Sequence, residues 1–127
     1  MVLSFETARG RVIVGLVSLV MLMLPAPLMA AGAFAMGKCG AYGQAYDYQS
    51  EAAARAAALR KCRGRCSTIV MKRACAAFSI DMADPCGPHG YAVRPRISSA
   101  LNAATRECYQ YGGKQCVIRA WACDGRG

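Results

Sequence analysis

The chain has 127 residues, with 16 lysines and arginines against 7 aspartates and glutamates, a formal net charge of +9 and 8 cysteines. This length excludes a large multidomain protein and leaves one small domain with a modest core. The positive charge favours anionic partners, although a basic surface also serves solubility.

The N-terminal segment, residues 1–35, is predicted to be a secretory signal peptide. Basic residues precede an apolar run, Val12–Leu24, which prolines and small residues follow. That order is typical of export signals, and the run is shorter than the roughly twenty residues that span a bilayer. Cleavage is expected after Ala30, Ala33 or Ala35, the last two completing Ala-x-Ala patterns. The mature domain, residues 36–127, would be secreted or periplasmic, without a membrane span.

The mature region aligns with itself as two tandem repeats, about residues 39–81 and 86–123. Nearly the same spacing separates Cys39-Gly40 from Cys62 and Cys86-Gly87 from Cys108. The stretches AYGQAYDYQSEAAARAAALRKC and PHGYAVRPRISSALNAATREC lie between them. Each repeat thus has four cysteines in the same order. They are Cys39, Cys62, Cys66 and Cys75 in the first repeat, and Cys86, Cys108, Cys116 and Cys123 in the second.

The first repeat is predicted to form a strand, a helix and a second strand. Alternating tyrosines favour a strand over 42–48, and Ser50 stands where an N-cap would begin a helix over 51–61. Gly64 supplies the left-handed stop. The β-branched run at 68–71 is the second strand, and CAAFSID continues as a hairpin into the next repeat.

The second repeat follows the same plan. Residues 91–94 form its first strand, and Ser98 caps a helix over 99–109 that ends at Gly112-Gly113. The run at 117–121 forms the last strand. The predicted fold is α+β and disulfide-linked: two tandem strand-helix-strand repeats form an antiparallel sheet packed by two alanine-rich helices. Residues three and four apart would face the sheet: Ala53, Ala56, Ala57 and Cys62 in one helix, and Ala100, Ala103, Ala104 and Cys108 in the other.

These features resemble those of a bacterial exported family known as domain of unknown function 4189. The resemblance rests on the glycine-rich aromatic strand, the alanine-rich helix ending in cysteine, the C-x-x-x-x-x-x-x-x-C-A-A pattern from Cys66 to Ala77, and GGKQCVIRAWAC. It covers about residues 39–123. It implies a small exported two-repeat module with no assigned activity, so there are no catalytic residues to carry over. Cys39 and Cys86 depart from the family pattern and are candidates for a further linkage.

An even number of cysteines in a small exported domain predicts a disulfide framework. A strand of about six residues spans roughly 20 Å, so its first cysteine lies beside the preceding helix end and its last lies far away. This favours Cys62 with Cys66 and Cys108 with Cys116. Pseudo-symmetry then suggests Cys39 with Cys86 and Cys75 with Cys123. The rival is that Cys39 and Cys86 pair with the helix ends of their own repeats.

Catalytic and metal-binding patterns are weak. His89 is the only histidine, and Cys86-Gly-Pro-His89 could hold a nucleophile beside a base. Cys86 has a counterpart in Cys39, however, which favours a disulfide. The chain lacks the paired C-x-x-C ligands of a zinc site. We expect no catalytic residues, no metal and no cofactor.

One basic cluster is denser than the rest: Arg55, Arg60, Lys61, Arg63, Arg65, Lys72 and Arg73. It could bind phosphates or acidic groups, or be only the solvated face of a helix and turn. Export argues against a genomic nucleic acid. A second candidate surface is aromatic, although most of its residues are expected to pack: Tyr42, Tyr46, Tyr48, Tyr109, Tyr111 and Trp121.

The sequence therefore predicts a non-catalytic binding or inhibitor-like module for a protein or an anionic envelope component. The alternatives are a small secreted enzyme acting on cell-envelope material and a structural envelope protein. Salt-sensitive binding would favour the first, turnover of envelope substrates the second, and envelope retention with neither of these the third.

Overall fold

The computed structural model describes residues 31–125, and the part of the predicted signal peptide before Ala31 lies outside them. Within this range the chain forms six strands, two α-helices and one short 3-10 turn. The order is β1 (Ala31–Gly37), η1 (Lys38–Gly40), β2 (Tyr42–Tyr48), α2 (Glu51–Lys61), β3 (Cys66–Met71), β4 (Ala74–Asp81), β5 (His89–Arg94), α3 (Ile97–Gln110) and β6 (Cys116–Asp124).

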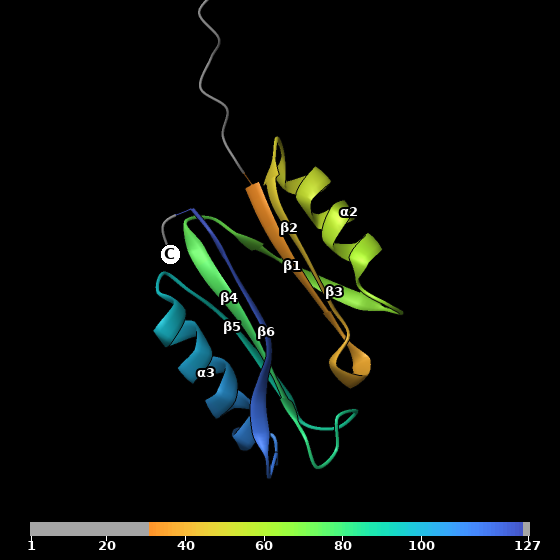
Figure 1. Ribbon diagram of the computed structural model, residues 1–127, viewed down its shortest axis with the longest axis vertical. Helices are drawn as coiled ribbons and strands as arrows, with labels where there is room; N and C mark the ends of the chain where they lie inside the picture. Colours follow the sequence, from red (N-terminus) through yellow and green to blue (C-terminus); the bar gives the residue numbers. More distant parts are fainter. Residues whose placement is uncertain (1–30, 126–127) are drawn as a thin grey trace, which may run out of the picture.

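The strands form two antiparallel sheets of three, in the orders β2-β1-β3 and β5-β4-β6. α2 packs on β1 and β2, and α3 packs on β4 and β5. In Figure 1 the two helices lie on the outer sides of the molecule, with all the strands between them. The fold is therefore α+β, as predicted, but with two sheets in place of one.

The order of elements also differs from the predicted repeat. Each half, residues 31–71 and residues 74–124, runs strand, strand, helix, strand. Ala74–Asp81, expected to close the first repeat, is the central strand of the second sheet and pairs with β5 and β6. All eight of its residues are buried. A strand buried on both faces has no polar alternation to show which neighbours it pairs with.

β1 is the strand that the sequence reading missed. It is central in the first sheet, and its residues from Ala31 to Met36 are all buried. Ala33 and Ala35 pack in the cluster beneath α2, whereas Phe34 and Met36 belong to the cluster between the sheets. Small apolar residues at this point looked like the end of a signal peptide. Cleavage after Ala33 or Ala35 would cut the strand, whereas cleavage after Ala30 leaves it whole.

α2 occupies the predicted residues but turns a different face inward. The Ser50 hydroxyl accepts a hydrogen bond from the Ala53 backbone N–H, which confirms the predicted N-cap. The buried residues are Ala54, Ala57 and Ala58, followed by Cys62, whereas the predicted Ala53 is half-buried and Ala56 is exposed. Six of the seven residues from 52 to 58 are alanine, so the sequence offered little contrast between faces.

α3 begins two residues earlier than predicted. Its N-cap is Arg96, which makes no side-chain cap, so Ser98 lies inside the helix and the cap expected there is wrong. The predicted inward face is correct at Ala100, Ala104 and Cys108. Polar residues separate these positions and reveal the helix phase.

The core has three layers of packed side chains. One lies between α2 and the first sheet and one between α3 and the second sheet, and both are built largely from alanine and cysteine. The middle layer joins the sheets and holds the large side chains Phe34, Met36, Met71, Phe78 and Ile80. Small residues let the helices approach closely, so most of the bulky apolar packing falls between the two halves.

Candidate functional site

The predicted basic cluster is divided between the two ends of β3. Arg63 and Arg65 lie in the turn between α2 and β3, and Lys72 and Arg73 follow the far end of that strand. Six residues of strand separate these ends by about 20 Å. Arg55 lies near the middle of α2, and Arg60 and Lys61 lie in its last turn, next to Arg63. The cluster is therefore continuous in the sequence, but its members are spread along α2 and β3 and do not gather at one point.

Two of these cations already have partners. Lys72 forms an ion pair with Glu51, and the hydrogen bond from its ammonium group holds the pKa of Glu51 below its ordinary value. Lys61 donates a hydrogen bond from Nζ to the Gln44 carbonyl oxygen over 2.8 Å. Arg65, at the end of the turn, instead lines a cleft.

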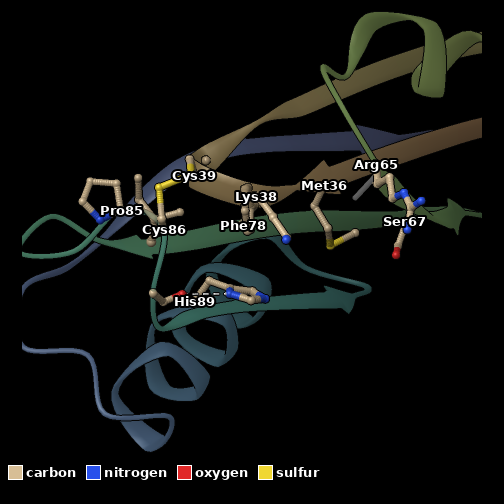
Figure 2. Close-up of a pocket in the computed structure, with 13 residues that line it drawn as sticks. Met36, Lys38, Cys39, Arg65, Ser67, Phe78, Pro85, Cys86 and His89 are labelled. Atoms are coloured by element: carbon tan, nitrogen blue, oxygen red, sulfur yellow. Dashed lines mark hydrogen bonds between the residues drawn. A yellow bond between two sulfur atoms is a disulfide. The ribbon is translucent and has the colours of Figure 1, made fainter.

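The cleft lies where the first half of the chain meets the second, and it has a volume of about 190 Å³. Figure 2 shows residues of η1, the start of β3 and the β4–β5 turn around it. It is lined by Met36, Gly37, Lys38, Cys39, Gly40, Arg65, Ser67, Phe78, Ile80, Pro85, Cys86, Gly87 and His89. Neither half contains the whole site.

Local backbone features bring the η1 residues to the cleft. β1 ends at Gly37, whose N–H donates to the Ala41 carbonyl oxygen over 2.8 Å. Cys39 then adopts a left-handed conformation, with φ of 58°. The Gly40 carbonyl accepts a 3.0 Å hydrogen bond from Nε of Arg119 on β6. This turn is thereby tied to the other half of the molecule.

The lining combines an apolar floor with a cationic rim. Met36, Phe78 and Ile80 are almost fully buried, whereas Lys38 and Arg65 are exposed. No aspartate or glutamate is among the described residues that line the cleft. Asp84 is not one of them, but its carboxylate lies beside the lining residue Gly87, where a notional Cβ would overlap it. The charge of the lining suits an anionic group.

Cys86 and His89, considered together as a nucleophile and base, both reach the cleft. The sulfur of Cys86 is bonded to that of Cys39, so it is not a free thiol. The Nδ1 atom of His89 lies 3.2 Å from the Gly87 carbonyl oxygen, to which a protonated Nδ1 donates. The imidazole ring also meets Phe78 edge-on at 6.2 Å between centroids. In the described chain, no three His, Cys, Asp or Glu side chains gather as a metal site.

All eight cysteines are paired. The pairs are Cys39–Cys86, Cys62–Cys66, Cys75–Cys123 and Cys108–Cys116. Two of them join a helix end to the next strand, as the spacing argument indicated. Cys75 and Cys123 face one another across β4 and β6. Cys75 is therefore not the structural counterpart of Cys123, although pairing the two was correct.

The aromatic residues expected mostly to pack are largely exposed. Of the six, only Tyr48 is half-buried, and Trp121 is 54% exposed. Tyr42, Gln44, Tyr46 and Lys61 line a shallow groove of about 380 Å³. The Arg119 guanidinium lies over the Tyr42 ring, 5.4 Å from its centroid. Partial burial, and to a lesser degree Tyr42, raise the pKa of Tyr46. Tyr91, also exposed, was missing from the predicted set.

Sequence reasoning missed Lys38, Ser67 and the cleft itself. Lys38 is far from Arg65 in the sequence, and it was not part of the predicted basic cluster. One signal could have found it: Lys38 precedes Cys39, and pairing Cys39 with Cys86 places it beside the β4–β5 turn. The predicted disulfide therefore already placed Lys38, Cys39 and Cys86 close together.

The chain matches one protein family, and the matched residues agree with the bounds of the domain described above. The family described as domain of unknown function (DUF4189) matches residues 31–123. The chain belongs to this family. The match begins with β1 and ends at the last cysteine, so in this DUF4189 domain β1 falls inside the matched region. No curated protein and no solved structure matches the chain. Neither described helix is long and apolar enough to cross a membrane.

Proposed function

We propose that this DUF4189 domain is an exported, non-catalytic binding module that holds an anionic group of a cell-envelope component in the cleft between its halves. The observation that carries the proposal is the lining of that cleft. Lys38 and Arg65 provide positive charge at the rim, and no carboxylate lies among the lining residues. Phosphate and carboxylate groups are the anions such a site would bind.

Export is supported by the cysteines. Four disulfides in a small domain fit an extracellular or periplasmic protein, because reducing cytosol does not maintain such bonds. The apolar run Val12–Leu24 has the order of a signal peptide,. An envelope location would bring the domain close to phosphorylated and carboxylated polymers.

The cleft favours binding over attack on a substrate. Its cations are carried on short, tied segments: Lys38 on η1, and Arg65 immediately before the disulfide-bonded Cys66. Ser67 adds a hydroxyl that can donate to an anion. A preformed cationic site loses less entropy on binding than a flexible one. The binding energy would come mainly from charge, so it would weaken with salt.

The test is binding of inorganic phosphate, followed by NMR, together with capture of envelope components at low and at high salt. The variant Lys38→Glu/Arg65→Glu reverses both cations of the cleft. We expect it to weaken phosphate binding by at least about tenfold and to abolish salt-sensitive capture.

A charge-matched control is Arg55→Glu/Arg106→Glu, which reverses two exposed cations on α2 and α3. This control should bind nearly as well as the wild-type protein. Equal loss in both variants would show that net charge alone drives binding. If both variants bind phosphate as well as the wild-type protein does, the cleft is excluded as the binding site.

A further inference from the structure

The four disulfides differ sharply in their access to solvent. Cys39 and Cys86 are both exposed. In each other pair at least one cysteine is buried: Cys62 is 6% exposed, and Cys75 and Cys108 are 0% exposed. The Cys39–Cys86 bond also lies at the cleft, as Figure 2 shows. An attacking thiolate must reach a sulfur atom, so access controls which bond exchanges.

Backbone packing adds to the protection of two other bonds. A methyl group added at Gly113 would overlap Sγ of Cys116 and approach Sγ of Cys108, so this backbone packs against both sulfurs. Gly37 packs against Sγ of Cys66 in the same way, at 2.8 Å from its notional Cβ. Cys75, in the centre of the second sheet, has no solvent contact.

The positive charge of the cleft also suits thiol–disulfide exchange. The attacking species and the leaving group are both thiolates, and nearby cations stabilise thiolates. Lys38 is the neighbour of Cys39 in the chain and lines the cleft that Cys39 and Cys86 also line, with Arg65 farther along it in Figure 2, and the described lining contains no carboxylate. Cys39 is held in a left-handed conformation that is costly for a residue other than glycine,.

We propose that Cys39–Cys86 is a reversible thiol–disulfide exchange site, reduced and re-formed while the other three disulfides remain closed. The co-reactant is a dithiol, either a small molecule or a dithiol oxidoreductase of the same compartment. One of its thiolates attacks one sulfur of the pair and expels the other as a thiolate, which forms a mixed disulfide. Its second thiolate then attacks its own sulfur in that mixed disulfide and releases the remaining cysteine. Two electrons and two protons pass from the dithiol, which ends as a disulfide, to Cys39 and Cys86.

The fold can survive this step because other contacts hold the halves together. The middle core layer, with Phe34 and Phe78, is shared by both sheets. Gln44 Nε2 donates to the Trp121 carbonyl oxygen over 3.0 Å, and Arg119 donates to Gly40. Reduction would therefore release one wall of the cleft without separating the sheets. Weaker anion binding by the reduced form follows from this, and that consequence rests on the proposed function.

The test is graded reduction of the oxidised protein with dithiothreitol, followed by rapid alkylation and peptide mapping by mass spectrometry. We expect Cys39 and Cys86 to be labelled at least about tenfold faster than the other six cysteines, since exchange follows access. Circular dichroism should remain native at that stage, and an added disulfide oxidant should restore the bond. The variant Cys39→Ser/Cys86→Ser should lose the fast phase only.

Labelling of all eight cysteines in one phase, or fast labelling of another pair, would overturn the exchange site. Phosphate titration of the oxidised and reduced forms tests the consequence separately. Fast labelling with unchanged affinity would retain the exchange site and overturn its control of the cleft. Failure of the oxidised protein to bind phosphate would count against the proposed function, and the labelling result would still decide the exchange site.

Discussion

At two positions a strand runs so close to a helix that only glycine fits. A Cβ atom on Gly43 would overlap the Ala58 carbonyl oxygen of α2, and one on Gly90 would overlap the Ala104 carbonyl oxygen of α3. The same contact thus occurs in both halves. It explains why alanine-rich helices and strand glycines occur together in this chain: each removes side-chain volume from one interface.

We expect Gly43→Ala to lower the free energy of unfolding by about 3 kcal/mol, because the helix must move away from the strand. Gly64→Ala is the control, since Gly64 has a φ of 84° and nothing within 4 Å of a notional Cβ. Gly64→Ala should lower the free energy of unfolding by only about 1 kcal/mol, because alanine is less stable than glycine in the left-handed conformation. Urea unfolding measures both, and equal costs would rule out the close approach.

Asp81 anchors the β4–β5 turn that carries Cys86. Its carboxylate accepts hydrogen bonds from the backbone N–H groups of Gln115 and Ala83, over 2.9 Å and 3.0 Å. The first of these is the main reason that the pKa of Asp81 lies below its ordinary value of 3.8. The ionised form is therefore favoured by folding. Its contribution to stability is present above pH 3.8 and is lost as the pH falls through the lower folded pKa,.

Asp81→Asn should accordingly lower the Tm at neutral pH. The difference from the wild-type protein should shrink as the pH falls below 3.8 and should vanish below the lower folded pKa, because the folded wild-type carboxylate is then protonated as well,. Thermal unfolding across that range provides the measurement, with Asp84→Asn as an exposed control on the same turn. A Tm difference independent of pH would mean that shape alone matters at position 81.

The two helices begin in different ways. Ser50 caps α2 with its hydroxyl, whereas α3 begins after Arg96 without a side-chain cap. The sequence shows a serine near both starts, and the hydrogen bond distinguishes them. Proline at position 95 shortly precedes the first turn of α3 and restricts the chain there.

Ser50→Ala should therefore cost about 1 kcal/mol of stability through the lost cap. Ser98→Ala, the matched change inside α3, should cost close to nothing, because alanine is the better helix former. Chemical denaturation of the two variants side by side tests this. Similar losses would show that the Ser50 bond contributes little to stability.

The position of signal cleavage decides whether β1 remains in the mature protein. A chain that begins at Met36 lacks residues 31–35, most of the central strand of the first sheet. β2 and β3 would then have only Met36 and Gly37 to pair with, because each pairs only with β1. Their unpaired backbone groups would be left without partners.

We expect a protein starting at Ala31 to fold and one starting at Met36 to lack cooperative unfolding. Near-ultraviolet circular dichroism and thermal melts of the two proteins distinguish these outcomes. Mass spectrometry of the exported protein should likewise find Ala31 as its first residue. A native, cooperative protein starting at Met36 would show that β1 is dispensable.

At the scale of the whole molecule, only one disulfide joins the two halves. Cys39–Cys86 spans 47 residues and links η1 to the β4–β5 turn, whereas Cys62–Cys66 spans 4. A crosslink that closes a longer loop removes more conformational freedom from the unfolded chain. The exposed bond is therefore expected to be the more stabilising of these two, although it buries less surface.

Replacing Cys39 and Cys86 with alanine should cost about 4 kcal/mol, and replacing Cys62 and Cys66 about 2 kcal/mol, on the loop-entropy relation. Equilibrium unfolding in urea of the two double variants compares them. A larger loss from the Cys62/Cys66 variant would show that local packing at the helix end outweighs loop closure.

The sequence by itself determined much of the local structure of this protein, although not β1 or the start of α3. Residues 51–61 form the predicted helix and residues 42–48 the predicted strand, because capping and alternation act over a few neighbours,. Two disulfide pairs, Cys62–Cys66 and Cys108–Cys116, followed from the reach of a strand and a helix, whereas the other two were suggested only by the symmetry of the repeats. The inward face of α2 did not follow, because alanine surrounds that helix and gives no amphipathic contrast.

Only the tertiary structure decided which strands share a sheet and where the halves meet. β1 and β4 are buried on both faces, so their sequences carry no sign of their neighbours,. Lys38, Arg65 and His89 line the same cleft because the two sheets pack together. The spacing of these residues in the sequence does not indicate that packing. Local patterns arise from short-range backbone chemistry, whereas this site exists only because two separately built layers bury their large side chains against each other.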